Sequence, residues 1–190
     1  MDTIRAFIAV KLDPQLQKAL GELQRQLKRG GAGMKWVEPE NIHLTIKFLG
    51  DVPADRIDEV KTAVAGVAAR SGGIDMSFAN IGVFPDLRRP RVVWAGVEQG
   101  KEELGRLAED IEAACGALGF AKEERPFVSH VTIARVKELG SPQRFLESLR
   151  PHQGKEFGRM RATRLSLIKS TLTPNGPKYD TIADACFSDV

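Results

Sequence analysis

The sequence contains few of the residues that most enzymes use for chemistry. Its 190 residues include three histidines, two cysteines and one tyrosine. Cys115 and Cys186 form neither a Cys-x-x-Cys motif nor a disulfide framework, so a cytoplasmic location is expected. Neither an HExxH zinc motif nor a GxxxxGK[ST] phosphate-binding loop is present, and we expect no metal and no cofactor.

Long hydrophobic runs and strong charge are also missing. No stretch approaches the roughly 20 apolar residues of a membrane span, and the N-terminus does not have the pattern of a signal peptide. We therefore expect no membrane partner. The formal net charge of +3 permits an anionic partner without requiring one. Aromatic residues make up 6% of the chain, too few for an extended RNA-binding surface, so a short or small substrate is conceivable.

Two of the three histidines occur in the same tripeptide context, His43-Leu44-Thr45 and His130-Val131-Thr132. Each tripeptide lies in a run that is typical of a strand, NIHLTIKFLG and FVSHVTIARV. Because side chains i and i+2 of a strand share a face, each histidine points with its threonine, opposite an apolar row. The repetition predicts one site with paired imidazoles and paired hydroxyls.

This set of groups suits a phosphate-ester reaction that needs no metal. Imidazole has an ordinary pKa near 6.5, so one ring can act as the base while the other acts as the acid. The threonine hydroxyls can donate to non-bridging phosphate oxygens. Either motif alone is better explained as the polar face of an amphipathic strand. Two copies that use two of three histidines favour a catalytic site.

Hydrophobic periodicity predicts helices and strands that alternate along the chain. The first predicted helix opens at Asp13-Pro14 and is ended by the glycines from Gly30. The other predicted helices span residues 54–69, 101–118 and 143–149, and the predicted strands span residues 5–12, 35–37, 42–49, 74–84, 91–97, 127–136, 163–171 and 178–187. The last two strands flank the turn sequence TPNGP. The two motifs have similar element order around them, which indicates a weak internal duplication and an α+β fold.

The flanks of the motifs extend the pattern over nearly the whole chain. They comprise RAFIAVKL, HLTIKFLGDV, IGVFPDLRRPRVVWAGV, RPFVSHVTIARV and SLIKSTLTPNGPKYDTI. Together these segments resemble the two-histidine (2H) phosphoesterase superfamily, in particular its RNA 2′,3′-cyclic phosphodiesterase branch, formerly called 2′-5′ RNA ligases. Ser129 stands where that family usually has proline, which removes no reactive group.

The resemblance implies a fold and an activity. The expected fold is α+β and bilobal, with two pseudo-symmetric antiparallel-sheet lobes and outer helices around a central cleft, in a single domain over residues 1–190. The expected activity is hydrolysis of RNA 2′,3′-cyclic phosphate ends to 2′-phosphomonoesters, with weak reverse 2′-5′ ligation and a monomeric enzyme. In that family His43 is the proton donor, His130 is the proton acceptor, and Thr45 and Thr132 hold the phosphate.

Further substrate-binding candidates depend on the strand geometry. Arg135 matches the arginine of the family's His-x-Thr-x-Ala-Arg pattern, but strict alternation puts it opposite His130 unless a bulge intervenes. Phe84 and Phe127, near loop boundaries, are candidates for stacking on a base. Phe48 has the parity of the apolar row and is predicted to lie in the core.

The remaining candidates have weaker signals. Arg125 is predicted to lie on an exposed loop, and His152 to be exposed and inert. Cys115 is predicted to be a buried small hydrophobe. Tyr179 matches a family tyrosine, and its role is either binding or structural. Arg88, Arg89 and Arg91 form a basic loop that either steers RNA or is a solvated hairpin tip.

Two alternative functions remain open. The same site suits a small cyclic nucleotide such as ADP-ribose 1″,2″-cyclic phosphate. A non-catalytic RNA-binding module is the other alternative, although pure binding does not need an acid/base pair.

Overall fold

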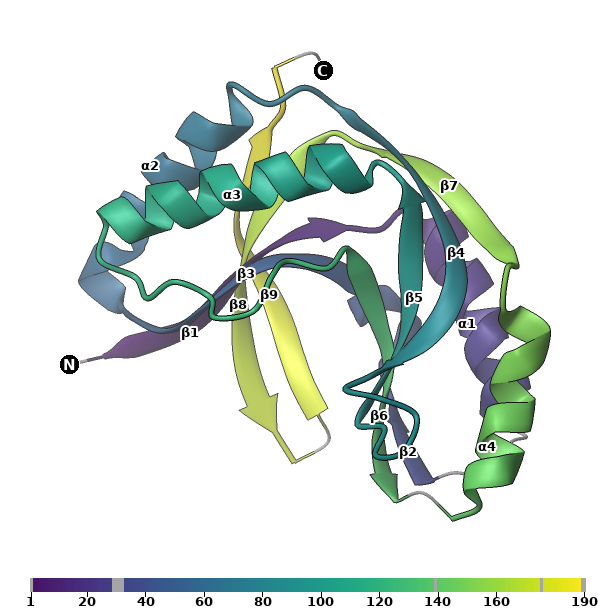
Figure 1. The fold of residues 1–190 in the computed structure, drawn as a ribbon. Helices are drawn as coiled ribbons and strands as arrows, with labels where there is room; N and C mark the ends of the chain where they lie inside the picture. The colour runs from purple at the N-terminus through teal and green to yellow at the C-terminus, as the bar shows by residue number, and fades with distance from the viewer. Residues whose placement is uncertain (1, 29–32, 139, 175, 189–190) are drawn as a thin grey trace.

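The computed structural model describes residues 2–28, 33–138, 140–174 and 176–188 (Figure 1). Within these residues nine strands form one sheet: β1 (Thr3–Lys11), β2 (Gly33–Trp36), β3 (His43–Pro53), β4 (Ile74–Phe84), β5 (Val92–Gln99), β6 (His130–Glu138), β7 (Glu156–Ala162), β8 (Arg164–Thr173) and β9 (Gly176–Cys186). The helices are α1 (Pro14–Leu27), α2 (Ile57–Ala68), α3 (Lys101–Ala117) and α4 (Pro142–Leu149), with short 3-10 turns at Pro39–Asn41, Ala54–Arg56 and Arg150–His152.

The strands follow the order β7-β4-β5-β6-β3-β1-β8-β9, with β2 added beside β6, and every pairing is antiparallel. The two motif strands, β3 and β6, are neighbours at the middle of this order. We call β3, β1, β8 and β9 the first half-sheet, and β6, β5, β4, β7 and β2 the second half-sheet. Reading outward from the middle, each half-sheet places its motif strand first and three further strands beyond it.

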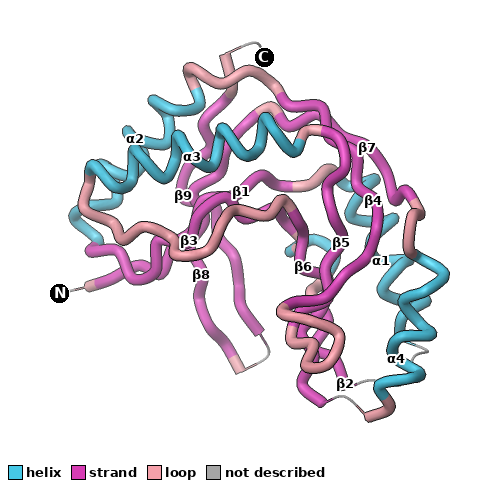
Figure 2. Tube along the Cα trace, viewed as in Figure 1, coloured by secondary structure: helices cyan, strands magenta, loops and turns pink. Residues whose placement is uncertain are grey.

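Helices cover the two half-sheets from outside, as the tube in Figure 2 shows. α2 and α3 pack together beside the first half-sheet, where α3 contacts β3 and α2 contacts β8 and β9. α1 contacts β6 and β7 of the second half-sheet and also touches α4. The mixed α+β architecture with a mainly antiparallel sheet confirms the expected fold class.

Local sequence signals explain where α1 begins and which side it buries. The Asp13 carboxylate accepts a hydrogen bond from the backbone N–H of Leu16 at 2.7 Å, and Pro14 occupies the first turn. Leu16, Leu20, Leu23 and Leu27 recur on one face and are buried. One continuous core cluster includes this face and the apolar rows of both half-sheets. The core therefore holds the backs of the motif strands.

The predicted elements correspond to observed ones with shifts of a few residues, and one strand was not predicted. β7 has the sequence EFGRMRA, in which apolar and polar residues do not alternate clearly enough to predict a strand. It exists because it pairs with β4 from Ile74 to Ala79. The second motif strand begins at His130, not at residue 127. Within the predicted TPNGP turn, Asn175 lies outside the described residues.

Candidate active site

The motif strands meet at one residue pair, which sets the orientation of both motifs. Leu44 of β3 is paired with Val131 of β6, and both side chains are fully buried. Leu44 is also paired with the buried Val10 of β1, on the core side of the sheet. The residues on either side of Leu44 and Val131 therefore point to the opposite face. The histidine and the threonine of both motifs share that face.

Antiparallel register places the two motifs head to tail around this pair. With Leu44 opposite Val131, His43 is beside Thr132 and Thr45 is beside His130. The two histidines are then diagonal neighbours across this single bridge. A local two-fold axis thus relates one His-x-Thr to the other. Two imidazoles and two hydroxyls thus surround the Leu44–Val131 pair on one face of the sheet.

The backbone orients both imidazole rings in the same way. Nδ1 of His43 donates to the carbonyl oxygen of Asn41 at 2.8 Å, and Nδ1 of His130 donates to that of Val128 at 2.7 Å. Each acceptor lies two residues before the histidine. Because Nδ1 is engaged, Nε2 is the atom left for proton transfer in both rings.

Burial changes the acid–base properties of both rings. Burial lowers the pKa of His43 below the usual 6.5, and the bond to Asn41 offsets part of this effect. The pKa of His130 is lowered for the same reason, with a similar offset from Val128. Both imidazoles are therefore mostly neutral at pH 7 in the free protein, and an anionic ligand between them favours the protonated form of one.

Aromatic rings pack against each imidazole. Phe7 stacks on His43 with ring centroids 4.7 Å apart, and Tyr179 of β9 meets His43 edge-on at 5.2 Å. On the other side, Phe84 meets His130 edge-on at 5.0 Å and Trp94 lies 6.4 Å away. These rings desolvate the imidazoles and limit their movement. The predicted candidate Phe84 therefore borders His130.

A β-bulge after each motif brings a further side chain to the site face. In β3 the pairing with β1 skips Ile46, so Phe48 is paired with Phe7 and is 58% exposed. The prediction of a core position for Phe48 was wrong, because this bulge reverses the alternation. In β6 the pairing with β5 skips Ile133, so Arg135 shares the face of Thr132. Burial raises the pKa of Tyr179, and the charges of Arg135 and Arg5 offset part of that rise.

The remaining candidates differ in how deeply they are buried. Phe127 is partly buried and packs against the core, while Arg125 and the arginines of the loop before β5 (Arg88, Arg89 and Arg91) are exposed. Cys115 is buried, as predicted, and burial raises the pKa of its thiol to about 11.

The prediction of an exposed His152 was wrong. The side chain is 6% exposed, and its Nδ1 has no hydrogen-bond partner among the described residues. Burial lowers the pKa of His152, and the charge of Lys155 lowers it further. The sequence RPHQG around His152 predicted a loop, but it gave no indication that this loop packs against the rest of the protein.

Sequence reasoning missed two buried polar residues that fix the motif strands. The Gln24 side chain donates to the carbonyl oxygens of Val37 at 2.6 Å and of Ile133, the bulged residue of β6, at 2.9 Å. Lys47 is 2% exposed, and its ammonium group donates to both Glu112 carboxylate oxygens and to the Ala121 carbonyl oxygen at 2.8–2.9 Å. The signal available for Gln24 was its place as a polar residue among the apolar positions of α1. For Lys47 the sequence was misleading, because the alternation of side chains along the strand put it on the same face as His43 and Thr45.

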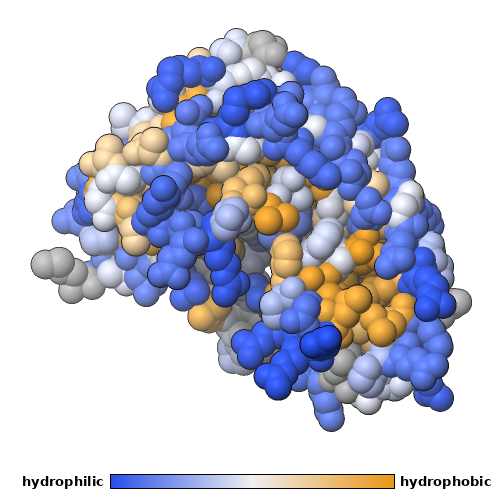
Figure 3. Space-filling model, viewed as in Figure 1, coloured by the Kyte–Doolittle hydropathy of each residue, from blue (hydrophilic) through white to orange (hydrophobic). Residues whose placement is uncertain are grey.

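Together these groups can transfer protons and hold an anion. Two Nε2 atoms, two hydroxyls and the Arg135 guanidinium converge on one face, which Figure 3 shows hollowed between the two half-sheets. Among the described side chains, no group of three or more His, Cys, Asp or Glu residues is placed to hold a metal ion. No described helix is long and apolar enough to cross a membrane.

Comparison with known proteins places this arrangement in a family. The sequence model of the family described as LigT like phosphoesterase matches residues 10–94 and 96–179, and each matched stretch contains one motif. An RNA 2′,3′-cyclic phosphodiesterase of Methanothermobacter thermautotrophicus is 38% identical over 93% of this chain and 95% of the relative. A protein of the same name from Aquifex aeolicus is 32% identical over 97% of each chain.

Solved structures share the fold. The TT0787 protein of Thermus thermophilus has a TM-score of 0.81 and 27% identity, covering 97% of this chain and 98% of its own. LigT of E. coli, solved as a complex with 3′-AMP, has a TM-score of 0.82 and 23% identity over 99% of this chain and 100% of its own, which shows the fold alone. With sequence and structure in agreement, the chain belongs to the LigT-like phosphoesterase family.

Proposed function

We propose that this protein hydrolyses RNA 2′,3′-cyclic phosphate ends to 2′-phosphomonoesters. The observation that carries the proposal is the Leu44–Val131 pair, around which two imidazoles and two hydroxyls share one sheet face. The names of relatives that are 32–38% identical over nearly the full chain support the same substrate.

The reaction needs one proton acceptor and one proton donor on opposite sides of phosphorus. In our proposal Nε2 of His130 takes a proton from water, which attacks phosphorus. The bond from phosphorus to O3′ breaks, and protonated Nε2 of His43 gives its proton to O3′. A 2′-phosphate and a free 3′-hydroxyl result. The local two-fold symmetry makes the two rings geometrically equivalent, so the assignment of roles follows the family resemblance.

The remaining side chains hold the substrate. Thr45 and Thr132 donate hydroxyl hydrogen bonds to the non-bridging phosphate oxygens, where negative charge increases in the transition state. Arg135 provides a guanidinium on the same face, and the exposed ring of Phe48 provides a surface for base stacking. Phe84 bounds the site beside His130. The packing of Phe127 against the core leaves it a weaker candidate.

The test uses an oligoribonucleotide that ends in 2′,3′-cyclic phosphate, in buffer with excess EDTA. We expect the wild type to yield only the 2′-phosphate, and His43→Ala and His130→Ala to lose activity by at least about 10³-fold. Chromatography against 2′- and 3′-phosphate standards identifies the product. Unchanged rates in both variants would exclude the two-histidine mechanism.

Two further arms separate the alternatives. ADP-ribose 1″,2″-cyclic phosphate offered at equal concentration tests the small-substrate alternative, which a higher kcat/KM on that compound would favour. Arg135→Gln and Phe48→Ala should raise KM for the oligoribonucleotide more than the exposed control variants Arg144→Gln and Leu146→Ala. We also propose a cytoplasmic monomer, which cell fractionation and light scattering test.

A further inference from the structure

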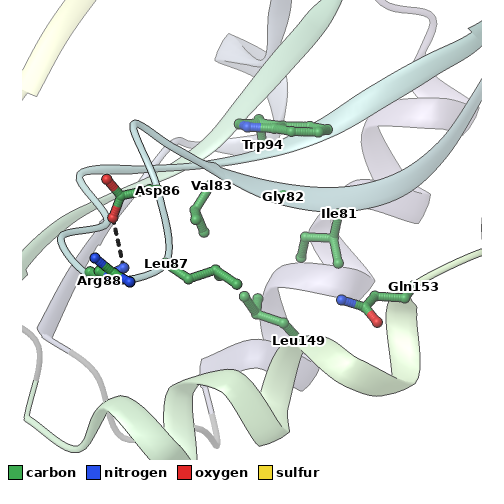
Figure 4. A pocket seen from close by; sticks show the side chains of 9 residues that line it. All are labelled: Ile81, Gly82, Val83, Asp86, Leu87, Arg88, Trp94, Leu149 and Gln153. Carbon is green, nitrogen blue, oxygen red and sulfur yellow. Dashed lines mark hydrogen bonds between the residues drawn. The ribbon is translucent and has the colours of Figure 1, made fainter.

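A cavity lies at the end of β4, outside the group of motif side chains. It has a volume of about 620 Å³, within the range of small-molecule sites. Figure 4 shows its lining residues, which are Ile81, Gly82, Val83, Asp86, Leu87, Arg88, Trp94, Leu149 and Gln153. They come from β4, from β5, from the loop between these strands, from the C-terminal end of α4 and, for Gln153, from the segment after the 3-10 turn Arg150–His152.

The walls of this cavity are mainly apolar. Leu149 at the end of α4 faces Val83 and Ile81 of β4, and Leu87 from the loop is 50% exposed at the mouth. Figure 3 shows apolar surface in this region of the second half-sheet. An exposed large hydrophobic side chain at the mouth of an apolar cavity is typical of a ligand-binding site.

The edge of β4 is open where the cavity lies. β7 pairs with β4 only as far as Ala79, whereas β5 pairs with the other edge as far as Phe84. Among the described strands, none pairs with the outer edge of residues 81–84, so backbone N–H and C=O groups there are available to a ligand. A Cβ on Gly82 would lie 2.1 Å from Cζ2 of Trp94, so the glycine lets the indole lie directly on the β4 backbone.

Trp94 connects this cavity to the catalytic side chains. Its ring lines the cavity, and it lies 6.4 Å from His130 and 5.3 Å from Phe84. Trp94 shares the sheet face of Thr132, whereas Ile81 and Val83 point to the opposite, core face of β4. A chain whose terminal phosphate lies beside His130 therefore passes over Trp94 and around the β4 edge to reach the cavity.

The charge at the mouth complements a phosphate backbone. Arg88 lines the cavity, and Arg89 and Arg91 are exposed on the same loop. The Asp86 carboxylate accepts hydrogen bonds from the backbone N–H groups of Arg88 at 2.7 Å and Arg89 at 3.0 Å, which holds the loop in a turn. An apolar cavity that Arg88 lines, with two further arginines on the same exposed loop, suits a base whose phosphate stays outside.

We infer that the cavity beside Trp94 binds a nucleobase of the RNA upstream of the cyclic phosphate. This inference rests on the proposed function and narrows its substrate class to oligoribonucleotides rather than mononucleotides. The apolar walls take the base, the open β4 edge offers hydrogen bonds to its rim, and Arg88 binds an upstream phosphate. The catalytic side chains then act only on the terminal nucleotide.

The kinetic test compares 2′,3′-cyclic AMP with cyclic-phosphate oligoribonucleotides of two to four nucleotides. In the wild type, kcat/KM should rise roughly tenfold once the chain is long enough to reach the cavity. Gln153→Trp fills the cavity from an exposed position, and Arg88→Gln removes its cation. Each should reduce the ratio of oligonucleotide to mononucleotide kcat/KM by about the same factor, through KM. Gln143→Trp and Arg144→Gln, both exposed on α4, are matched controls that should keep the wild-type ratio.

A binding assay separates this inference from the proposed function. Unreactive 3′-phosphate oligoribonucleotides of one to four nucleotides compete with a fluorescent tetranucleotide, read by anisotropy. If no cyclic phosphate is hydrolysed but Gln153→Trp weakens binding of the longer chains, the proposed function fails and the subsite stands. If chain length affects neither assay, or if Gln153→Trp behaves like Gln143→Trp, the inference is wrong, and an extended peptide along the open β4 edge becomes the alternative occupant.

Discussion

The imidazoles of His43 and His130 differ from free histidine because of contacts within the chain itself. Each ring is tied through Nδ1 to a carbonyl oxygen two residues earlier, and each is enclosed by aromatic rings. The first contact fixes the tautomer, and the second disfavours the charged form. The protonated state that catalysis requires must therefore be stabilised by the bound phosphate.

This environment predicts an acidic pH optimum. The active form has one imidazole protonated and one neutral, and its population is largest midway between the two pKa values. Both pKa values lie below the usual 6.5, so kcat/KM should be bell-shaped with its maximum below pH 6.5. A pH–rate profile on 2′,3′-cyclic AMP checks this, and a maximum above pH 7 would contradict it.

The threonines give a second prediction at the level of single residues. Thr45→Val keeps the shape of the side chain but removes the hydroxyl donor, so kcat should fall by about 10²–10³-fold. Thr132→Val should behave in the same way because the local two-fold axis makes it equivalent. Thr62→Val removes an exposed hydroxyl on α2 and serves as the control. A fall of less than threefold in both site variants would show that the hydroxyls do not hold the phosphate.

Single residues also show what the sequence predicts reliably. His43 and Thr45 share a face because they are two residues apart, which needs only strand geometry. Phe48 was misplaced because it lies beyond Ile46, where the bulge reverses the alternation. Arg135 has the same relation to Ile133, and the sequence left its face open for this reason. A bulge depends on the partner strand, so no periodicity within one strand predicts it.

At the level of elements, each motif strand depends on a buried polar group from another element. Lys47 enters the interior because of the bulge, and there it holds α3 through Glu112 and the loop before β6 through Ala121. This contact joins the strand of His43 to the segment that leads to His130. The ion pair is 1% exposed on the lysine side and 22% exposed on the glutamate side.

Breaking this pair should destabilise the protein. Glu112→Ala leaves the Lys47 ammonium buried with only a carbonyl partner, and we expect a loss of about 2–4 kcal/mol in the free energy of unfolding. Arg159→Ala breaks an exposed pair with Glu156 and should cost less than about 1 kcal/mol. Urea denaturation measures both. Equal effects of the two variants would show that the buried pair adds no stability.

The sequence did not predict which strands are neighbours in the sheet. Helix and strand types follow from periodicities of 3.6 and 2 residues, and these identified most elements correctly. The pairing of β3 with β6 joins Leu44 to Val131, and no local signal specifies such a distant partner. The repeated His-x-Thr pattern predicted that both motifs line one site, but it did not specify which residues of the two strands are paired.

At the level of the whole molecule, the three histidines affect stability against acid. Burial lowers the pKa of His43, His130 and His152 in the folded state, so the unfolded chain binds protons more readily. The free energy of unfolding should therefore be insensitive to these groups above pH 6.5 and should fall as the pH drops below 6.5 toward the folded pKa values. Carboxylates titrate mainly below pH 5.

Denaturation curves between pH 8 and pH 5 test this expectation. The wild type should lose stability below pH 6.5, and a triple variant with His43→Gln, His130→Gln and His152→Gln should lose less over the same interval. If both proteins have the same pH dependence, the histidines do not control acid stability.

Two helices pack on the half-sheet to which their preceding strand does not belong. α1 follows β1 of the first half-sheet but packs on β6 and β7, and α3 follows β5 of the second half-sheet but contacts β3. At least one helix that covers each half-sheet therefore follows a strand of the other half-sheet. Each half-sheet therefore depends on a helix that the other supplies, so the two half-sheets should unfold together as one unit, with the Leu44–Val131 pair joining their motif strands.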